Sequence, residues 1–125
     1  MNFYQCEACK TLVYLIEKGG CLPSCCGEKM KEVVIHKKGE QGLEKHVPVV
    51  VLEKGKVQVK VGEVSHPMLD AHYIDWIFLV TDKGNQTKIL KPGMAPEATF
   101  LIGEDEKVLG VYAHCNLHGI WEADL

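Results

Sequence analysis

The 125-residue sequence predicts a mainly β protein, in which a small, metal-held N-terminal knuckle precedes an antiparallel β-sandwich of about seven strands. Three observations lead to this prediction. Apolar residues recur with period two from Val47 onward, glycine-bearing turn sequences separate these runs at short intervals, and most of the cysteines cluster near the start of the sequence. No segment has a long helical period, so we expect strands to build the fold.

The N-terminal knuckle is predicted from five of the six cysteines, which lie within residues 1–36. Below roughly 40 residues a segment buries too little apolar surface to fold alone, and a metal or disulfides normally supply the missing stability. The clustered spacing favours metal-bound thiolates over disulfides. Because the polar, glycine-bearing stretch 37–42 is typical of a linker, we expect one domain at residues 1–36 and a second at residues 37–125.

Four of these cysteines can surround one ion as a tetrahedron. They form a Cys-x-x-Cys pair and an adjacent pair: Cys6, Cys9, Cys25 and Cys26. Neighbouring side chains in an extended chain point in opposite directions, so the adjacent cysteines can reach one ion only if the backbone bends, which Gly27 permits. Zinc and iron suit this set equally well. Cys21 is left over and is interpreted as a small residue in a turn.

Runs of alternating apolar residues predict the strands of the sandwich. In chain order, these runs cover residues 47–51, 57–61, 74–80, 98–102 and 108–113. In the third run the alternating residues are Ile74, Trp76, Phe78 and Val80. Turn-forming residues separate the runs at 53–55, 82–85 and 103–106. This pattern is typical of half-buried antiparallel strands joined by short loops.

A second set of metal-binding residue types is spread over the sandwich part of the chain. It consists of four histidines and one cysteine: His46, His66, His72, Cys115 and His118. Because they come from separate segments, only a folded domain can bring them together, and their mixed nitrogen and sulfur donors suit a transition metal. If they bind divalent iron as a square pyramid, the site carries a net charge of about +1 and one position stays open to a small anion. His36 and His114 are interpreted as ordinary histidines.

Composition and charge exclude several classes of function. With 46% hydrophobic and 25% charged residues, the sequence is typical of a globular protein, and a net charge of -3 provides no basic surface for nucleic acid. The first residues lack the charged and apolar regions of a secretory signal, and no apolar run approaches the roughly 18 residues of a membrane span. We therefore expect a cytoplasmic protein that binds neither nucleic acid nor a membrane.

Five motifs in order make the chain similar to a known family. They are Cys-Glu-Ala-Cys at 6–9 with Cys-Cys-Gly-Glu at 25–28, Glu-Lys-His-Val-Pro-Val at 44–49, His-Pro-Met at 66–68 with His72, Leu-Lys-Pro-Gly at 90–93 with Ala-Pro-Glu at 95–97, and Cys-Asn-Leu-His-Gly at 115–119. With this set the chain resembles the desulfoferrodoxins, the two-iron form of superoxide reductase, over essentially its whole length.

The resemblance implies two iron ions per chain. The four clustered cysteines would bind a rubredoxin-like iron in a desulforedoxin-like domain. A catalytic iron would lie in an immunoglobulin-like sandwich, with Cys115 as the axial ligand and the four histidines named above as equatorial ligands. The implied reaction is the one-electron reduction of superoxide to hydrogen peroxide without dioxygen, which detoxifies superoxide in an anaerobe or microaerophile. The resemblance also implies rubredoxin or a similar small electron donor, and a homodimer.

Glu44 and Lys45 are the catalytic residues that the resemblance implies. In the family the glutamate binds the sixth position of the oxidised iron, which fits the attraction of a carboxylate to a ferric site carrying about +2. Lys45 would lie near the mouth of the site, where a positive charge steers an anionic substrate and helps to stabilise the peroxide formed.

Three other functions fit part of this pattern. A non-enzymatic iron electron carrier would use both metal sites, but it would not need Glu44 and Lys45 beside the five-donor set. A zinc-stabilised binding module would need only the four-cysteine site. A superoxide dismutase must oxidise as well as reduce its substrate, and an axial thiolate argues against this, because its electron donation favours the formation and release of peroxide.

Overall fold

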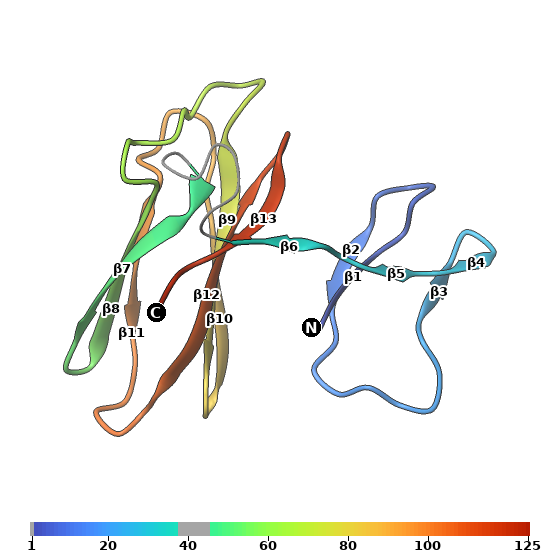
Figure 1. Ribbon diagram of the computed structural model, residues 1–125, viewed down its shortest axis with the longest axis horizontal. Coiled ribbons are helices and arrows are strands. Elements are labelled where there is room, and N and C mark those ends of the chain that lie inside the picture. Colours follow the sequence, from blue (N-terminus) through green and yellow to red (C-terminus); the bar gives the residue numbers. More distant parts are fainter. Residues whose placement is uncertain (1, 38–45) are drawn as a thin grey trace. The chain divides into compact units, whose positions relative to one another are not determined.

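The computed structural model describes residues 2–37 and 46–125 of the chain (Figure 1). Contacts between residues divide the chain into two compact units, Met1–Val34 and Ile35–Leu125. Each unit has its own sheets and its own buried cluster. None of the described residues belongs to a helix long and apolar enough to span a membrane.

The first unit contains a three-stranded sheet in the order β2-β1-β5 and a separate hairpin of β3 and β4. The strands are β1 (Phe3–Gln5), β2 (Leu12–Tyr14), β3 (Ser24–Cys25), β4 (Glu28–Lys29) and β5 (Lys31–Glu32). Its core is small: Tyr4, Cys6 and Met30 form the buried cluster, and partly buried side chains such as Val13 pack against them. So few buried side chains leave the unit dependent on another source of stability.

The second unit is a β-sandwich whose two sheets lie face to face in Figure 1. One sheet has five strands in the order β10-β9-β12-β13-β6, and the other has three in the order β11-β8-β7. The strands are β6 (Ile35–His36), β7 (Pro48–Glu53), β8 (Lys56–Val61), β9 (Ile74–Thr81), β10 (Gly84–Ile89), β11 (Glu97–Leu101), β12 (Val108–Cys115) and β13 (Gly119–Glu122). The predicted β-rich architecture is confirmed.

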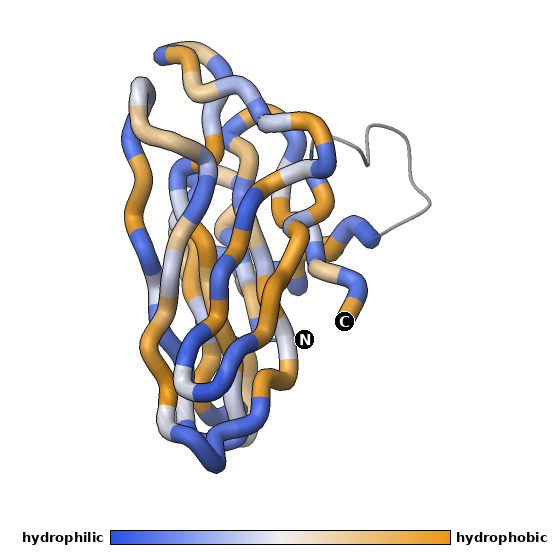
Figure 2. Tube along the Cα trace, turned by 90° about the vertical axis from the view of Figure 1, so that its left-hand side faces the viewer, coloured by the Kyte–Doolittle hydropathy of each residue, from blue (hydrophilic) through white to orange (hydrophobic). Residues whose placement is uncertain are grey.

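The core of the second unit lies between its sheets. On β8, Val57, Val59 and Val61 are buried and alternate with exposed polar residues, as the period-two pattern predicts. They belong to one cluster with Ile77 and Leu79 of β9, which are fully buried. Figure 2 shows the corresponding alternation of hydrophobic and hydrophilic residues along the strands of this unit.

Two details of this sandwich differ from the predictions. On β9, the residues in the core cluster are Ile74, Ile77 and Leu79, whereas Trp76 and Val80 of the predicted alternation are only partly buried. Ile74 and Phe78 of the predicted alternation are buried, so the prediction holds for half of these residues, because large apolar residues occupy both faces of this strand. The sandwich is also not purely antiparallel, since β6 pairs with β13 in parallel.

Candidate metal centres

The four-cysteine cluster begins with a tight turn after β1. The Cys6 amide donates to the Thr11 carbonyl over 2.9 Å, and the Lys10 amide donates to the Cys6 carbonyl over 2.9 Å. Lys10 adopts a left-handed backbone conformation with φ of 68°, which closes the turn. The Cys9 amide can therefore donate to the sulfur of Cys6, at 3.5 Å.

A second tight turn presents the adjacent pair of cysteines. Cys26 and Gly27 both have positive φ, 54° and 78°, in the two-residue turn that joins β3 to β4. Two consecutive left-handed residues form the type I′ turn that two-residue hairpins prefer. The bend predicted at Gly27 is thus present, and it brings the sulfur atoms of Cys25 and Cys26 to within 3.9 Å of each other.

The separations between these sulfur atoms match a shared metal ion. In a tetrahedral site with metal–sulfur bonds of about 2.3 Å, two sulfur atoms lie about 3.8 Å apart. The Sγ atoms of Cys9 and Cys25 are 3.6 Å apart, and those of Cys25 and Cys26 are 3.9 Å apart. All four ligand atoms of Cys6, Cys9, Cys25 and Cys26 lie within 4.8 Å of one another, and all six cysteines are free thiols. The exposed Cys21 is not in this group.

The protonation of this cluster also favours a cation. The Thr11 hydroxyl lies 3.1 Å from the Cys9 sulfur, and this hydrogen bond lowers the pKa of the Cys9 thiol to about 6. The neighbouring sulfur of Cys9, followed by that of Cys6, raises the pKa of Cys25 to about 12. Without a metal, the thiol of Cys25 therefore keeps its proton while that of Cys9 loses its proton more easily. A bound cation would replace the remaining protons.

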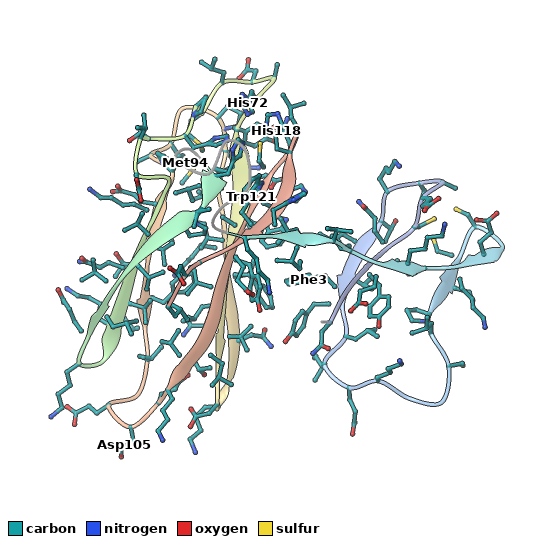
Figure 3. All side chains as sticks on the ribbon, viewed as in Figure 1. Phe3, His72, Met94, Asp105, His118 and Trp121 are labelled. Carbon is teal, nitrogen blue, oxygen red and sulfur yellow. The ribbon has the colours of Figure 1, made fainter. Side chains whose placement is uncertain are left out.

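The second cluster is assembled at one end of the sandwich. His46 precedes β7, His66 and His72 lie in the loop between β8 and β9, Cys115 ends β12, and His118 lies in the turn before β13. In Figure 3, His72 and His118 lie at the end of the sandwich that also carries Met94, and Asp105 marks the opposite end.

The five residues of the second cluster differ in their exposure to solvent. His46, His66 and Cys115 are buried, with the thiol completely inaccessible, whereas His72 is half-buried and His118 is exposed. The described residues therefore shield most of these ligand atoms from water, and His118 is the exposed member of the cluster.

The separations between the ligand atoms of this second cluster also fit one metal. Two nitrogen ligands at right angles, each about 2.1 Å from a metal, lie about 3.0 Å apart. The His46 Nε2 and His118 Nδ1 atoms are 3.0 Å apart, and the Cys115 sulfur lies 3.5 Å from the same His118 nitrogen. The ligand atoms of His46, His66, His72 and Cys115 lie within 4.8 Å of one another.

His66 has the tautomer that a metal ligand requires. Its Nδ1 lies 2.8 Å from the Pro67 carbonyl oxygen, and because a carbonyl can only accept, Nδ1 must carry the hydrogen. Burial lowers the pKa of His66 to about 4, so the ring is neutral at pH 7. Its Nε2 is left with a lone pair that is buried and has no hydrogen-bond partner among the described residues. A bound metal ion would supply a partner for this atom.

The sulfur of Cys115 is placed so that a metal could bind it as a thiolate, in place of its proton. Burial raises the pKa of the Cys115 thiol, and hydrogen bonds from the Leu117 and His118 amides act in the opposite direction. These amides belong to the turn that ends at Gly119, whose φ of 83° favours glycine.

Trp121 is a site residue that the sequence analysis missed. Its ring stacks on His46 with centroids 4.8 Å apart and planes 20° apart, and its indole N–H donates to the His118 carbonyl over 3.1 Å. His36 also contacts the Trp121 ring, with centroids 4.8 Å apart. The sequence signal that could have pointed to Trp121 was its position two residues after Gly119, which places both residues on the same face of β13.

The remaining predicted residues lie apart from the clusters or outside the described residues. Glu44 and Lys45 belong to the part of the chain that the structure does not describe, so their catalytic roles stay predictions. His114 is not in either cluster, and its Nδ1 lies 2.6 Å from an Asp75 carboxylate oxygen. His36 is also outside the clusters. The positions of His36 and His114 agree with their interpretation as ordinary histidines.

The fold and the two clusters define a class of small β proteins with a cysteine knuckle and a sandwich that gathers histidines and a cysteine at one end. The desulfoferrodoxin family model matches residues 38–124. The chain is 45% identical to a desulfoferrodoxin from Nitratidesulfovibrio vulgaris, over 98% of this chain and 95% of that protein. It is 42% identical to a desulfoferrodoxin homolog from Archaeoglobus fulgidus, over 98% and 96%. This chain belongs to the desulfoferrodoxin family.

A solved structure agrees with this assignment. The superoxide reductase from Treponema pallidum superimposes with a TM-score of 0.79 and is 40% identical, with 98% of this chain and 97% of that chain covered. The likeness therefore extends over both units of the chain, beyond the residues that the family model matches.

Proposed function

We propose that this protein is a superoxide reductase, which reduces superoxide to hydrogen peroxide by one electron at a non-haem iron. The observation that carries the proposal is the gathering of nitrogen and sulfur ligand atoms within 4.8 Å at one end of the sandwich. The residues that would hold the catalytic iron are His46, His66, His72, His118 and Cys115. A second iron would be held by Cys6, Cys9, Cys25 and Cys26.

We extend the proposal to the two parts of the chain. Residues 1–36 would form the desulforedoxin-like iron-binding domain, and residues 37–125 the catalytic domain. The compact units Met1–Val34 and Ile35–Leu125 support a division close to this boundary. Each unit contains all the described ligands of one proposed iron.

The side chains of the second cluster prepare the reaction in distinct ways. A bound iron would supply the single electron that superoxide takes up on its way to peroxide. The Cys115 thiolate donates electron density and so favours formation and release of a basic oxygen anion. Buried His46 and His66 keep water from one side, and exposed His118 leaves the other side open to the substrate. Lys45 would steer the superoxide anion, and the negative charge of Glu44 would be attracted to the metal that these residues would hold.

The product ratio separates this function from its alternatives. Superoxide should be added in pulses to the iron-loaded protein with an excess of reductant, and both peroxide and dioxygen should be measured. We expect one hydrogen peroxide per superoxide and no dioxygen. Release of dioxygen in a fixed ratio to peroxide would indicate a dismutase. Superoxide that decays no faster than without protein would indicate a non-enzymatic electron carrier.

Partners and location complete the proposal. We propose that rubredoxin or a similar small protein supplies the electrons, that two chains form a homodimer, and that the protein works in the cytoplasm. These statements are supported by the sequence resemblance to the desulfoferrodoxins.

The Lys45→Gln variant tests the proposed steering of superoxide. We expect its bimolecular rate with superoxide to fall about tenfold at low ionic strength, with an unchanged iron content, because a nearby positive charge raises the encounter rate of an anion. The difference should shrink as salt screens the charge. Stopped-flow or pulse-radiolysis kinetics at several salt concentrations would measure it. Lys83→Gln is the matched control. It removes the same charge in the turn between β9 and β10, at the end of β9 that is far from Cys115. Equal rates for both variants would contradict the role of Lys45.

Thr11→Val tests the hydrogen bond to the four-cysteine site. The Thr11 hydroxyl lies 3.1 Å from the Cys9 sulfur and donates to it when that sulfur is a thiolate. Hydrogen bonds to the sulfur ligands stabilise the more negative, reduced form of an iron site. We therefore expect a lower reduction potential for this iron, measured by redox titration of its visible absorption. Thr87→Val on exposed β10 should leave the potential unchanged. A Thr11→Val potential equal to that of the parent would refute the tuning role.

A further inference from the structure

Asn116 connects the loop that carries His66 and His72 with the turn that carries His118. It follows Cys115 in the turn between β12 and β13, and its side chain reaches the loop that contains His72. Its Oδ1 accepts a hydrogen bond from the Tyr73 amide at 2.9 Å, and its Nδ2 donates to the Ala71 carbonyl at 3.1 Å. The side chain of Asn116 thus bonds to the residues immediately before and after His72.

The backbone completes this connection. The Asn116 amide donates to the Tyr73 carbonyl over 3.1 Å. His72 itself exchanges two backbone hydrogen bonds with Leu69, at 3.0 and 2.9 Å. The segment around His72 is therefore held by Leu69 on one side and by Asn116 on the other. A shift of the His72 backbone relative to Cys115 would break at least one of these hydrogen bonds.

We propose that Asn116 is a positioning residue of the catalytic centre, which sets the distance between His72 and the pair formed by Cys115 and His118. This inference rests on the proposed function, because it requires these residues to bind one metal. A metal site needs its ligand atoms within a few tenths of an ångström of their places. Asn116 is exposed, so water can replace its hydrogen bonds, and we expect it to contribute to geometry more than to stability.

Three variants of the full-length, iron-loaded protein test this role. Asn116→Ala removes both side-chain hydrogen bonds and keeps the backbone one. Asn116→Asp keeps the oxygen that accepts from Tyr73 but loses the Nδ2 donor to Ala71. Asn85→Ala changes an exposed asparagine on β10 and is the matched control. The readouts are the rate of iron loss to a chelator and the long-wavelength sulfur-to-iron absorption band of the oxidised protein, with the four-cysteine iron as an internal reference.

We expect Asn116→Ala to lose the catalytic iron about 10- to 100-fold more readily, the usual effect of removing a group that orients metal ligands. Its sulfur-to-iron band should shift, Asn116→Asp should be intermediate, and Asn85→Ala should match the parent. A lower melting temperature of the metal-free Asn116→Ala protein, combined with an unchanged band and unchanged iron retention, would overturn the inference. If Asn116→Ala does not fold, the same comparison is made with Asn116→Asp.

The parent protein separates the two proposals. If the parent binds no iron at this cluster, both the proposed function and the role of Asn116 fail. If the parent binds iron and reduces superoxide, while both Asn116 variants retain iron and band like the parent, only the role of Asn116 fails.

Discussion

Replacing Cys115 with serine is expected to lower the rate of superoxide reduction by more than about 100-fold and to abolish the long-wavelength sulfur-to-iron band. Removal of groups that only orient metal ligands already costs 10- to 100-fold, and Cys115 is proposed to contact the metal directly. Its sulfur is completely buried and receives hydrogen bonds from the Leu117 and His118 amides. A neutral serine hydroxyl in this position donates less electron density and changes the net charge of the site by one.

Kinetics and spectra of the iron-loaded variant would test this expectation. Cys21→Ser is the matched control, because Cys21 is exposed and belongs to neither cluster of ligand atoms. It should keep the parent's rate, band and iron content. A Cys115→Ser protein with the parent's rate would exclude the proposed role of the Cys115 sulfur and with it the proposed mechanism.

Replacing Cys9 with serine is expected to unfold the first unit while the sandwich stays folded. Among the described residues, Tyr4, Cys6 and Met30 form a buried cluster in this unit, Phe3 is also buried, and the sandwich has its own separate core. With so little apolar burial, the metal must supply much of the folding free energy of the first unit. Loss of one of four thiolates weakens that binding.

Hydrogen exchange of backbone amides, read residue by residue, would measure this effect. We expect the protection of residues 2–34 to fall to that of an unfolded chain, and the protection of residues 46–125 to remain. A chelator strong enough to remove iron from the first site should produce the same pattern in the parent, and Cys21→Ser should not. Continued protection of β1 and β2 in Cys9→Ser would indicate that the small core is sufficient.

Much of the fold was predictable because burial and exposure alternate clearly on some strands. On β8 every second residue is a buried valine, so both the strand and its inward face follow from the sequence. On β9 the strand was predicted but its inward face was not, since Phe78 and Leu79 are adjacent and both buried. β10 was missed because its residues are mostly exposed and polar, which removes the apolar alternation.

The candidate site was predictable to the extent that residue type reveals a ligand. Histidine and cysteine side chains mark the ligand atoms directly, and the structure gathers them into the two expected clusters. The contributions of Asn116 and Trp121 were not predictable, because their hydrogen bonds go to backbone atoms that meet only in the folded loops. The residue type of a side chain does not reveal which backbone atom it will bond to in the fold.

The two clusters differ in how far along the chain their ligands are separated. Cys9 and Cys25, whose sulfur atoms are in contact, are 16 residues apart, whereas His46 and His118 are 72 residues apart. Closing the shorter loop costs less chain entropy, so the knuckle can capture its metal while the chain is still folding and fold around it. The distant histidines meet only after the sheets have paired. A metal could therefore bind the proposed catalytic centre only in a finished sandwich, so its presence there would report that the sandwich has folded correctly.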